Sequence, residues 1–384
     1  ERGLTYRRYL EKLVAEDKAY ISDEVPKEAA HGEDNDEEGE WRESFSGKKE
    51  IIRFRNPKKV VTFMDEVRGE ISVDTTELGD FVIAKSLEEP LYHLGVVIDD
   101  FEMGVTHVIR GDDGIYNTPR QILIQDAIGA PRPTYCHVPF ILGKDKKKLS
   151  KRHGTGAVRD LREKGYLPEA LVNYLSLLGW NPGTAEEIFS FEELIQKFDF
   201  THLQKAPAVF DIEKLNWFNR EYLKKIPDEQ FGKMVLAQIP ALSAHPGFSA
   251  ERFAKIIPLL KERVTVLSDL NALYTDGELT YFFETPTVDA SSLIPKDATR
   301  GAVLGHLTHI LTTLETLSEW SSETVRGALW DYATEKGRGA VLWPMRYARS
   351  GRMKSPDPFA LSHVLGKEET IERIKSAVAL LTPA

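Results

Sequence analysis

Apolar residues recur every three or four positions near the start of the chain, which is the spacing of an amphipathic helix. Tyr6, Tyr9, Leu10, Leu13 and Val14 would share one face of that helix. Because residue 1 is glutamate and the helical spacing begins almost at once, we expect a further N-terminal part to precede this sequence.

The pattern then changes from helical spacing to short extended runs. Residues 33–40 hold six acidic side chains and no apolar one, which predicts a solvated loop. Residues 51–85 are rich in β-branched and apolar side chains between turn signals such as Asn56-Pro57 and Arg68-Gly69. This region is expected to form short strands.

Residues 106–142 have the pattern of one βαβ unit. Residues 106–110 predict a strand, Thr118-Pro119 begins a helix that Gly129 ends, and residues 135–142 predict a second strand. The crossover of such a unit is right-handed and its strands are parallel, so the segments after both strands lie at one edge of the sheet. Those segments are 110–113 and 143–152, where we expect a ligand to bind.

Helical spacing dominates beyond residue 160. Pro168 fits a first helical turn and Gly179 a helix end, and long amphipathic stretches follow at 251–273, 304–317 and 368–381. Seven prolines are expected in the connections between helices: Pro240, Pro246, Pro286, Pro295, Pro344, Pro356 and Pro358. A helical C-terminal domain from about residue 225 is the simplest interpretation.

Composition narrows the class of protein. The 384 residues suggest two or three domains, and neither an apolar run of about 18 residues nor a secretory signal is present, so no membrane span is predicted. The single cysteine, Cys136, excludes an intramolecular disulfide and is expected to be a buried thiol. A net charge of -10 argues against indiscriminate coating of nucleic acid but leaves a local basic surface open.

The densest charge falls in residues 144–152, where six of nine side chains are Lys or Arg. A solvated loop is one interpretation. Because this loop leaves the carboxyl end of a parallel strand, Lys148, Ser150 and Lys151 could instead offer charges and a hydroxyl to a triphosphate. No P-loop or dinucleotide fingerprint is present, and His306 and His309 lack a third ligand, so no metal site is predicted.

The segment KLSKR at residues 148–152 resembles the KMSKS signature of class I aminoacyl-tRNA synthetases, in the form found in glutamyl-tRNA synthetases. The resemblance extends over most of the chain. It includes GVTHVIRGDD at 104–113, NTPRQ at 117–121, GYLPEALVNYL at 165–175 and WPMR at 343–346.

This resemblance implies an α/β fold, with a partial class I Rossmann-like nucleotide-binding fold, a mixed α+β insertion and an all-α anticodon-binding domain. We expect residues 1–91 to be the acceptor-stem-binding insertion, 92–160 the second half of the catalytic domain, 161–224 a stem-contact region and 225–384 the anticodon-binding domain. The HIGH motif of the family is missing, since the segment HLGV at 93–96 lacks its final histidine. We therefore expect a truncated synthetase.

The resemblance also implies a glutamate–tRNA ligase that forms glutamyl-adenylate from glutamate and ATP and then transfers the glutamyl group to the terminal adenosine of tRNA(Glu). Magnesium would accompany the ATP, and no protein-bound zinc is expected. The residues that match the family's functional positions are Lys148, Ser150 and Lys151 for catalysis, Lys148, Lys151, Asp113 and Ile141 for ATP, Arg110 and Tyr92 for glutamate, and Arg346 for tRNA.

Several alternatives stay open at this stage. Arg110 could form an ion pair with Asp112 or Asp113, and Arg346 could form a salt bridge at the edge of the core. The chain could be a catalytically silent tRNA-binding or regulatory protein. A glutaminyl enzyme is less favoured. Resemblance to that family would imply a β-barrel C-terminal region, whereas residues 225–384 have helical periodicity. We expect a cytoplasmic monomer. An organellar location stays open, and so does tRNA(Gln) as a further substrate.

Overall fold

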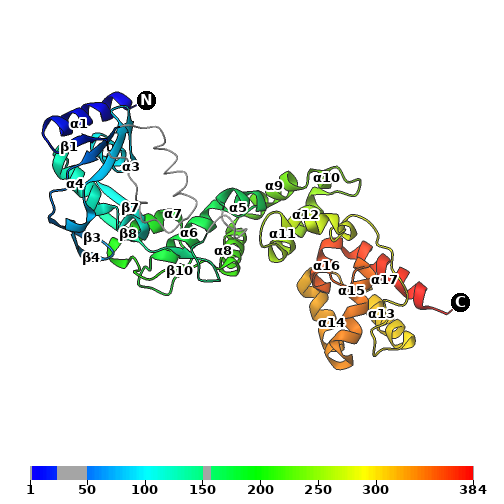
Figure 1. Cartoon of the computed structure of the whole chain (residues 1–384). Coiled ribbons are helices and arrows are strands. Elements are labelled where there is room, and N and C mark those ends of the chain that lie inside the picture. The colour runs from blue at the N-terminus through cyan, green and yellow to red at the C-terminus, as the bar shows by residue number, and fades with distance from the viewer. Residues whose placement is uncertain (1, 24–49, 150–156, 384) are drawn as a thin grey trace. The chain divides into compact units, whose positions relative to one another are not determined.

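The computed structural model describes residues 2–23, 50–149 and 157–383. The chain divides into two compact units (Figure 1). The first consists of residues 1–150 and 175–210, and the second of residues 151–174 and 211–384.

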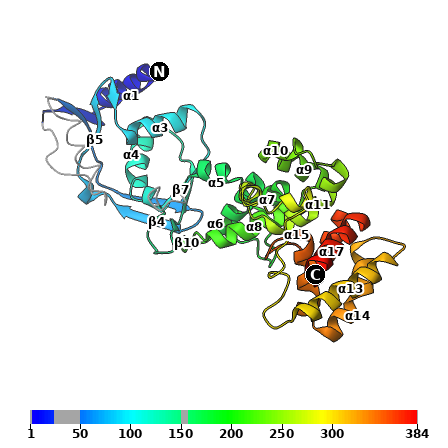
Figure 2. The ribbon, with the colours of Figure 1, turned by 90° about the vertical axis from the view of Figure 1, so that its right-hand side faces the viewer.

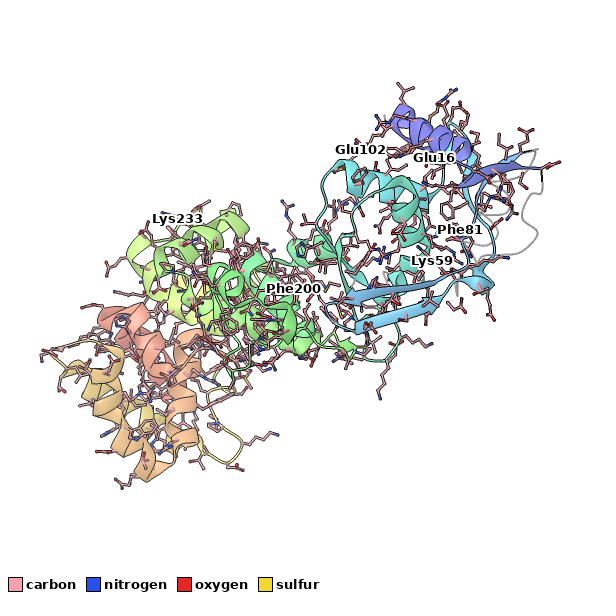
Figure 3. All side chains as sticks on the ribbon, turned by 90° about the vertical axis from the view of Figure 1, so that its left-hand side faces the viewer. Glu16, Lys59, Phe81, Glu102, Phe200 and Lys233 are labelled. Carbon is pink, nitrogen blue, oxygen red and sulfur yellow. The ribbon has the colours of Figure 1, made fainter. Side chains whose placement is uncertain are left out.

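The first unit begins with the predicted amphipathic helix, α1 (Gly3–Ala15), which buries Tyr9, Leu10 and Leu13. Glu102 lies beside this helix (Figure 3), and its carboxylate accepts a hydrogen bond of 2.5 Å from the hydroxyl of Tyr9. An antiparallel sheet follows in the order β1 (Ala19–Ser22), β2 (Ile51–Phe54), β5 (Phe81–Ser86) and β6 (Glu89–Pro90). The prediction of short strands between residues 51 and 85 is therefore confirmed.

A second sheet holds the βαβ unit. Its order is β4 (Gly69–Asp74), β3 (Val60–Asp65), β8 (Thr134–Val138) and β7 (His107–Gly111). Strands β7 and β8 are parallel, with Arg110 opposite His137, and helix α4 (Thr118–Ile128) connects them. Gly129 ends α4 in the left-handed conformation at φ 79°, which only glycine adopts without strain. The predicted parallel βαβ unit is confirmed.

One face of this sheet carries the core of the unit. Helix α3 (Tyr92–Glu102) packs on α4, and α4 covers the sheet (Figure 2). Burying such apolar side chains contributes about 1.5–3 kcal/mol each. The core includes Phe63 and Tyr135 from the strands, Ile122 and Ile124 from α4, and Leu94 and Val97 from α3. This packing holds α3 against α4 and α4 against the sheet.

The prediction of one strand over residues 135–142 is wrong. Strand β8 ends at Val138, and a separate short strand, β9 (Ile141–Leu142), pairs in parallel with β10 (Ala208–Val209). Pro139 lies between them and has no N–H to donate to a ladder. The break turns the chain into another sheet before the lysine-rich segment begins.

Helices make up most of the remaining chain. Their bounds are α5 (Val158–Lys164), α6 (Pro168–Gly179), α7 (Phe191–Lys197), α8 (Ile212–Lys225), α9 (Asp228–Gln238), α10 (Pro240–Ser243), α11 (Ala250–Arg263), α12 (Asp269–Thr275), α13 (Arg300–Glu315), α14 (Ser322–Lys336), α15 (Arg338–Ser350), α16 (Pro358–Leu365) and α17 (Lys367–Leu381). In the second unit, α13, α14, α15 and α17 lie side by side around one apolar core (Figure 1). The helical C-terminal region is confirmed.

Two details of the helical region differ from the predictions. The stretch 251–273 is two helices, α11 and α12, because Val264 at the end of α11 is extended. Pro344 lies inside α15 and is buried, so the prediction that it would sit in a connection is wrong. A proline inside a helix removes one backbone hydrogen bond, and packing against the surrounding helices can offset that loss.

Candidate active site

Arg110 lies at the carboxyl end of β7, and its guanidinium is held by neutral groups. Nε donates to Nε2 of His137 at 3.0 Å. One terminal nitrogen donates to three oxygens, the hydroxyl of Thr118 at 2.7 Å, the amide oxygen of Gln121 at 2.9 Å and the carbonyl of Gly114 at 3.1 Å. Gly114 is needed here, because a Cβ at this position would collide with the Arg110 side chain.

The expected alternative for Arg110, an ion pair with a neighbouring aspartate, is not found among the described residues. Asp112 pairs instead with Arg68 at 2.5 Å, and Asp113 pairs with Lys148 at 3.3 Å. A half-buried cation that contacts only neutral groups keeps its charge available for an anion. Arg110 therefore has the setting of a carboxylate-binding residue.

A second arginine adds positive charge near the same place. Arg120 lies in the first turn of α4 and is half-buried, which lowers its pKa. It has no hydrogen bond or ion pair within the described ranges. Burial, followed by the charges of Arg120 and Arg110, lowers the pKa of His93 to about 4, so His93 is neutral at pH 7.

Buried polar atoms near Arg110 also lack partners within the described ranges. They are Nδ1 of His93 and Nε2 of Gln121, whose amide oxygen already bonds Arg110. Tyr92 begins α3, its side chain is 62% exposed, and its ring contacts the imidazole of His93 at a centroid distance of 5.5 Å. Unpaired polar atoms beside two arginines and an exposed tyrosine hydroxyl are suited to a small polar anion.

The segments after the two strands come together as the βαβ topology requires. The Nζ of Lys148 lies 3.3 Å from the carboxylate of Asp113 and 4.5 Å from the ring centroid of Phe140. Both charged side chains are about two-thirds exposed, so the pair contributes little to stability and remains accessible. Ile141 lies in β9 at the start of this segment. Ser150 and Lys151 lie outside the described residues.

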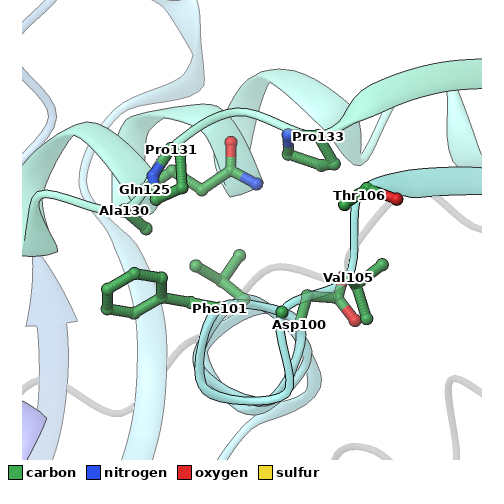
Figure 4. Close-up of a pocket in the computed structure, with 10 residues that line it drawn as sticks. Asp100, Phe101, Val105, Thr106, Gln125, Ala130, Pro131 and Pro133 are labelled. Atoms are coloured by element: carbon green, nitrogen blue, oxygen red, sulfur yellow. The ribbon is translucent and has the colours of Figure 1, made fainter.

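A pocket of the first unit lies away from this site. It has a volume of about 170 Å³ and is lined by the end of α3 and the connection from α4 to β8, with Asp100, Phe101 and Gln125 among its residues (Figure 4). Thr106 and Pro133 line it just before β7 and β8 begin. This pocket is thus at the amino ends of the strands, opposite to Arg110. Burial raises the pKa of Asp100.

Two buried residues of the site were not anticipated from the sequence. His137 on β8 and Asp65 at the end of β3 are both fully buried and lie 2.7 Å apart, Nδ1 to Oδ2. A histidine in a strand next to a predicted ligand edge was the available signal for His137. Nothing local marked Asp65, because its partner lies 72 residues away in the sequence.

Arg346 lies in α15 of the second unit. Its guanidinium donates to the carbonyl of Met353 at 2.8 Å and lies 4.9 Å from the ring centroid of Trp343. No acidic side chain pairs with it among the described residues, so the alternative of a salt bridge is not found there. A half-exposed arginine on an aromatic ring can present its charge to nucleic acid.

His306, His309 and Cys136 contact or are buried among other side chains of the fold. Nδ1 of His306 lies 2.8 Å from the hydroxyl of Tyr332, and the ring of His309 stacks on the same tyrosine. Cys136 is buried, and burial raises the pKa of its thiol to about 11. Within residues 2–23, 50–149 and 157–383, no group of three or more His, Cys, Asp or Glu side chains could hold a metal ion.

Comparison with known families places this chain in a class. Residues 1–217 match the catalytic domain described as tRNA synthetases class I (E and Q), and residues 204–378 match an anticodon binding domain. None of the helices in the described ranges combines the length and apolar character that crossing a membrane needs.

Individual relatives narrow the class. The chain is 42% identical over 345 residues to the glutamate–tRNA ligase of Nitrosospira multiformis, covering 88% of this chain and 72% of the relative. It is 34% identical over 400 residues to glutamate–tRNA ligase 1 of Caldanaerobacter subterraneus, covering 98% and 82%. The crystal structure of a glutamate tRNA ligase from Elizabethkingia meningosepticum superposes with a TM-score of 0.77 at 32% identity, covering 99% of this chain and 83% of that one. This chain belongs to the glutamate–tRNA ligase family.

Proposed function

We propose that this chain is a glutamate–tRNA ligase that activates L-glutamate with ATP and transfers it to the terminal adenosine of tRNA(Glu). The observation that carries the proposal is Arg110, a half-buried arginine at the carboxyl edge of a parallel sheet whose hydrogen-bond partners are all neutral. The family membership supports the reaction, and the sheet edge is where ligands of such folds bind.

Glutamate is bound through its side-chain carboxylate by Arg110, because one terminal nitrogen of the guanidinium has no partner among the described residues and a charged N–H donor forms a strong hydrogen bond to a carboxylate. The hydroxyl of Tyr92 supplies a further hydrogen bond to the amino acid. Arg120 adds positive charge that no acid among the described residues neutralises. Glutamine, which carries no charge on its side chain, would gain much less from this site.

ATP is bound along the segment that follows β8. Lys148 and Lys151 neutralise charge on the phosphates, Ser150 orders the loop, and Asp113 and the backbone of Ile141 contact the adenosine. Magnesium enters as the ATP complex. The pairing of Lys148 with Asp113 supports this arrangement, because it links the ends of the two parallel strands.

Activation needs no nucleophile from the protein. The α-carboxylate of glutamate attacks the α-phosphorus of ATP, the bond to the β-phosphate oxygen breaks, and pyrophosphate leaves with that bond's electron pair. A ribose hydroxyl of the terminal adenosine then attacks the acyl carbon, and AMP leaves. The protein contributes position and charge, with Lys148 and Lys151 opposite the phosphate charge that develops.

Contact with the anticodon region of the tRNA is assigned to the helical part of the chain, where Arg346 is the named residue. The four expected regions, 1–91, 92–160, 161–224 and 225–384, stay predictions, as do a cytoplasmic location, a monomer and a choice between tRNA(Glu) and tRNA(Gln). Backbone phosphate contacts make the interaction strongly dependent on salt.

Charging of purified tRNA(Glu) with labelled glutamate tests the proposal. The full chain, the variants Lys148→Ala and Lys151→Ala, and the surface control Lys59→Ala are compared, since Lys59 pairs with Asp126 in an exposed position. Ligase activity predicts glutamate transfer that needs ATP, that both loop variants reduce at least tenfold and that the control retains. Salt-sensitive tRNA binding without any transfer would instead indicate a silent tRNA-binding protein.

A further inference from the structure

Arg110 is the last member of a row of hydrogen-bonded side chains that begins at Asp65 and passes through His137. Asp65 ends β3, His137 lies in the neighbouring strand β8, and Arg110 lies in β7 beyond it. The side chains of Asp65 and His137 are fully buried. The three residues therefore cross the sheet from its interior to the candidate glutamate site.

The carboxylate of Asp65 is committed entirely to accepting hydrogen bonds. Oδ1 accepts from the backbone N–H groups of Val67 and Arg68 at 3.0 and 2.8 Å. Oδ2 accepts from the backbone N–H of His137 at 3.0 Å and lies 2.7 Å from Nδ1 of the same residue. Because both oxygens already accept from backbone N–H groups, the carboxylate is the acceptor toward the ring as well, and the ring proton of His137 sits on Nδ1.

With the proton on Nδ1, the other ring nitrogen is an acceptor. Nε2 of His137 lies 3.0 Å from Nε of Arg110, which always carries a proton, and 3.1 Å from the hydroxyl of Thr118. Burial is the main cause that lowers the pKa of His137, which favours the neutral ring. Neutral His137 thus has one fixed tautomer, and that tautomer suits Arg110.

We propose that Asp65 and His137 are positioning residues that hold the guanidinium of Arg110 in the orientation that binds the side-chain carboxylate of glutamate. The hydrogen bond that Nε donates to His137 occupies Nε, and the bonds to Gly114, Thr118 and Gln121 occupy one terminal nitrogen. The other terminal nitrogen has no partner among the described residues and is left for the substrate. This inference rests on the proposed function and adds the residues that set its glutamate specificity.

If His137 positions Arg110, its loss should affect the binding of glutamate more than the binding of ATP. Displacing a substrate-binding group by about 1 Å can lower the rate about a hundredfold. Loss of the His137 contact should therefore weaken the binding of glutamate and leave the binding of ATP unchanged. A purely structural role for His137 would lower stability and affect both substrates alike.

The experiment compares His137→Leu with His137→Gln in the full chain. Leucine has similar bulk and no acceptor, whereas the amide oxygen of glutamine can reach the place of Nε2 and accept from Arg110. His107→Leu is the control, because His107 is an exposed histidine at the start of β7. Charging assays give KM for glutamate and for ATP, and calorimetry gives the dissociation constant of glutamate.

We expect His137→Leu to raise KM for glutamate roughly tenfold or more and KM for ATP less than twofold, and His137→Gln to recover most of the loss. In a cycle with Arg110→Lys, which lacks the Nε donor, adding His137→Leu should cause no further loss. Equal rises in both KM values, or losses that multiply in the double variant, would overturn the inference.

A spectroscopic measurement tests the tautomer without reference to activity. The ¹⁵N resonances of His137 should show a protonated Nδ1 and an unprotonated Nε2, and a proton on Nε2 would overturn the inference. An unmodified chain that neither binds nor transfers glutamate would contradict the proposed function instead, so the two failures are distinguishable.

Discussion

Nε of Arg110 donates a hydrogen bond to a histidine ring, Nε2 of His137 at 3.0 Å, and no carboxylate among the described residues pairs with this arginine. Charged side chains are almost never fully buried without a partner of opposite charge. Arg110 is half-buried and bonded only to neutral groups, so its charge is available to an anionic ligand.

Replacing Arg110 by lysine keeps the charge but removes the planar guanidinium, which bonds His137, Gly114, Thr118 and Gln121 and so orients its remaining terminal nitrogen. We expect kcat/KM for glutamate to fall roughly thirtyfold, about 2 kcal/mol, since hydrogen bonds between charged groups contribute on that order. KM for ATP should stay within twofold. Arg132→Lys is the matched control, because Arg132 forms an exposed pair with Asp126. A variant with unchanged glutamate kinetics would remove Arg110 from the site.

Removing the amino group of Lys148 should slow adenylate formation by roughly tenfold to a hundredfold, because one charge opposite the developing phosphate charge is lost. Stability should not change measurably, since the pair with Asp113 is exposed. Single-turnover kinetics and the melting temperature of Lys148→Ala measure the two effects. A large drop in melting temperature with normal kinetics would mean that the pair is structural.

His93 predicts a dependence of stability on pH. Its pKa is lowered to about 4 by burial and by the charges of Arg120 and Arg110, against an ordinary value of 6.5. The unfolded chain therefore binds the proton first, and stability falls as pH drops from about 6.5 toward 4. The loss by pH 4.5 should be about 2–3 kcal/mol.

Hydrogen exchange of the α3 amides at pH 7 and pH 4.5 measures this loss where it arises. In His93→Gln the opening free energy of α3 should change less between the two pH values than in the unmodified chain. Equal changes in the two proteins would show that His93 does not carry the effect.

Cys136 should be inert in the native chain. The thiolate is the reactive form, and a pKa of about 11 leaves little of it at pH 8, in a side chain that is 1% exposed. Iodoacetamide should label the unfolded chain at least a hundredfold faster than the folded one. Cys136→Ala should retain charging activity. Rapid labelling of the folded chain that abolishes charging would indicate a functional thiol.

Much of the site could be predicted from the sequence because its signals are local. Pro119 and Gly129 bound α4, and the rule for parallel crossovers places residues 110–113 beside the segment after β8. The contact between Lys148 and Asp113 follows from that topology. Arg110 was singled out because it matches the substrate arginine of the family that the sequence resembles, and its place at the end of a strand agrees with that role.

The rest depends on contacts between distant parts of the chain. Asp65 meets His137 only because β3 lies beside β8, and no spacing in the sequence reveals that order. The break at Pro139 is different, because it has a local signal: a proline inside the run 135–142 argues against a single strand there. Pro344 is tolerated inside a helix through burial, which packing decides and local propensity does not.

The central claim is that this chain activates glutamate at the site around Arg110. Glutamate-dependent ATP–pyrophosphate exchange in the presence of tRNA tests it most directly, with Lys151→Ala and Arg110→Lys measured beside the unmodified chain. We expect exchange by the unmodified chain and none by Lys151→Ala. The Arg110→Lys variant should show exchange only when the glutamate concentration is raised at least tenfold. Exchange that both variants sustain at the normal glutamate concentration would contradict it.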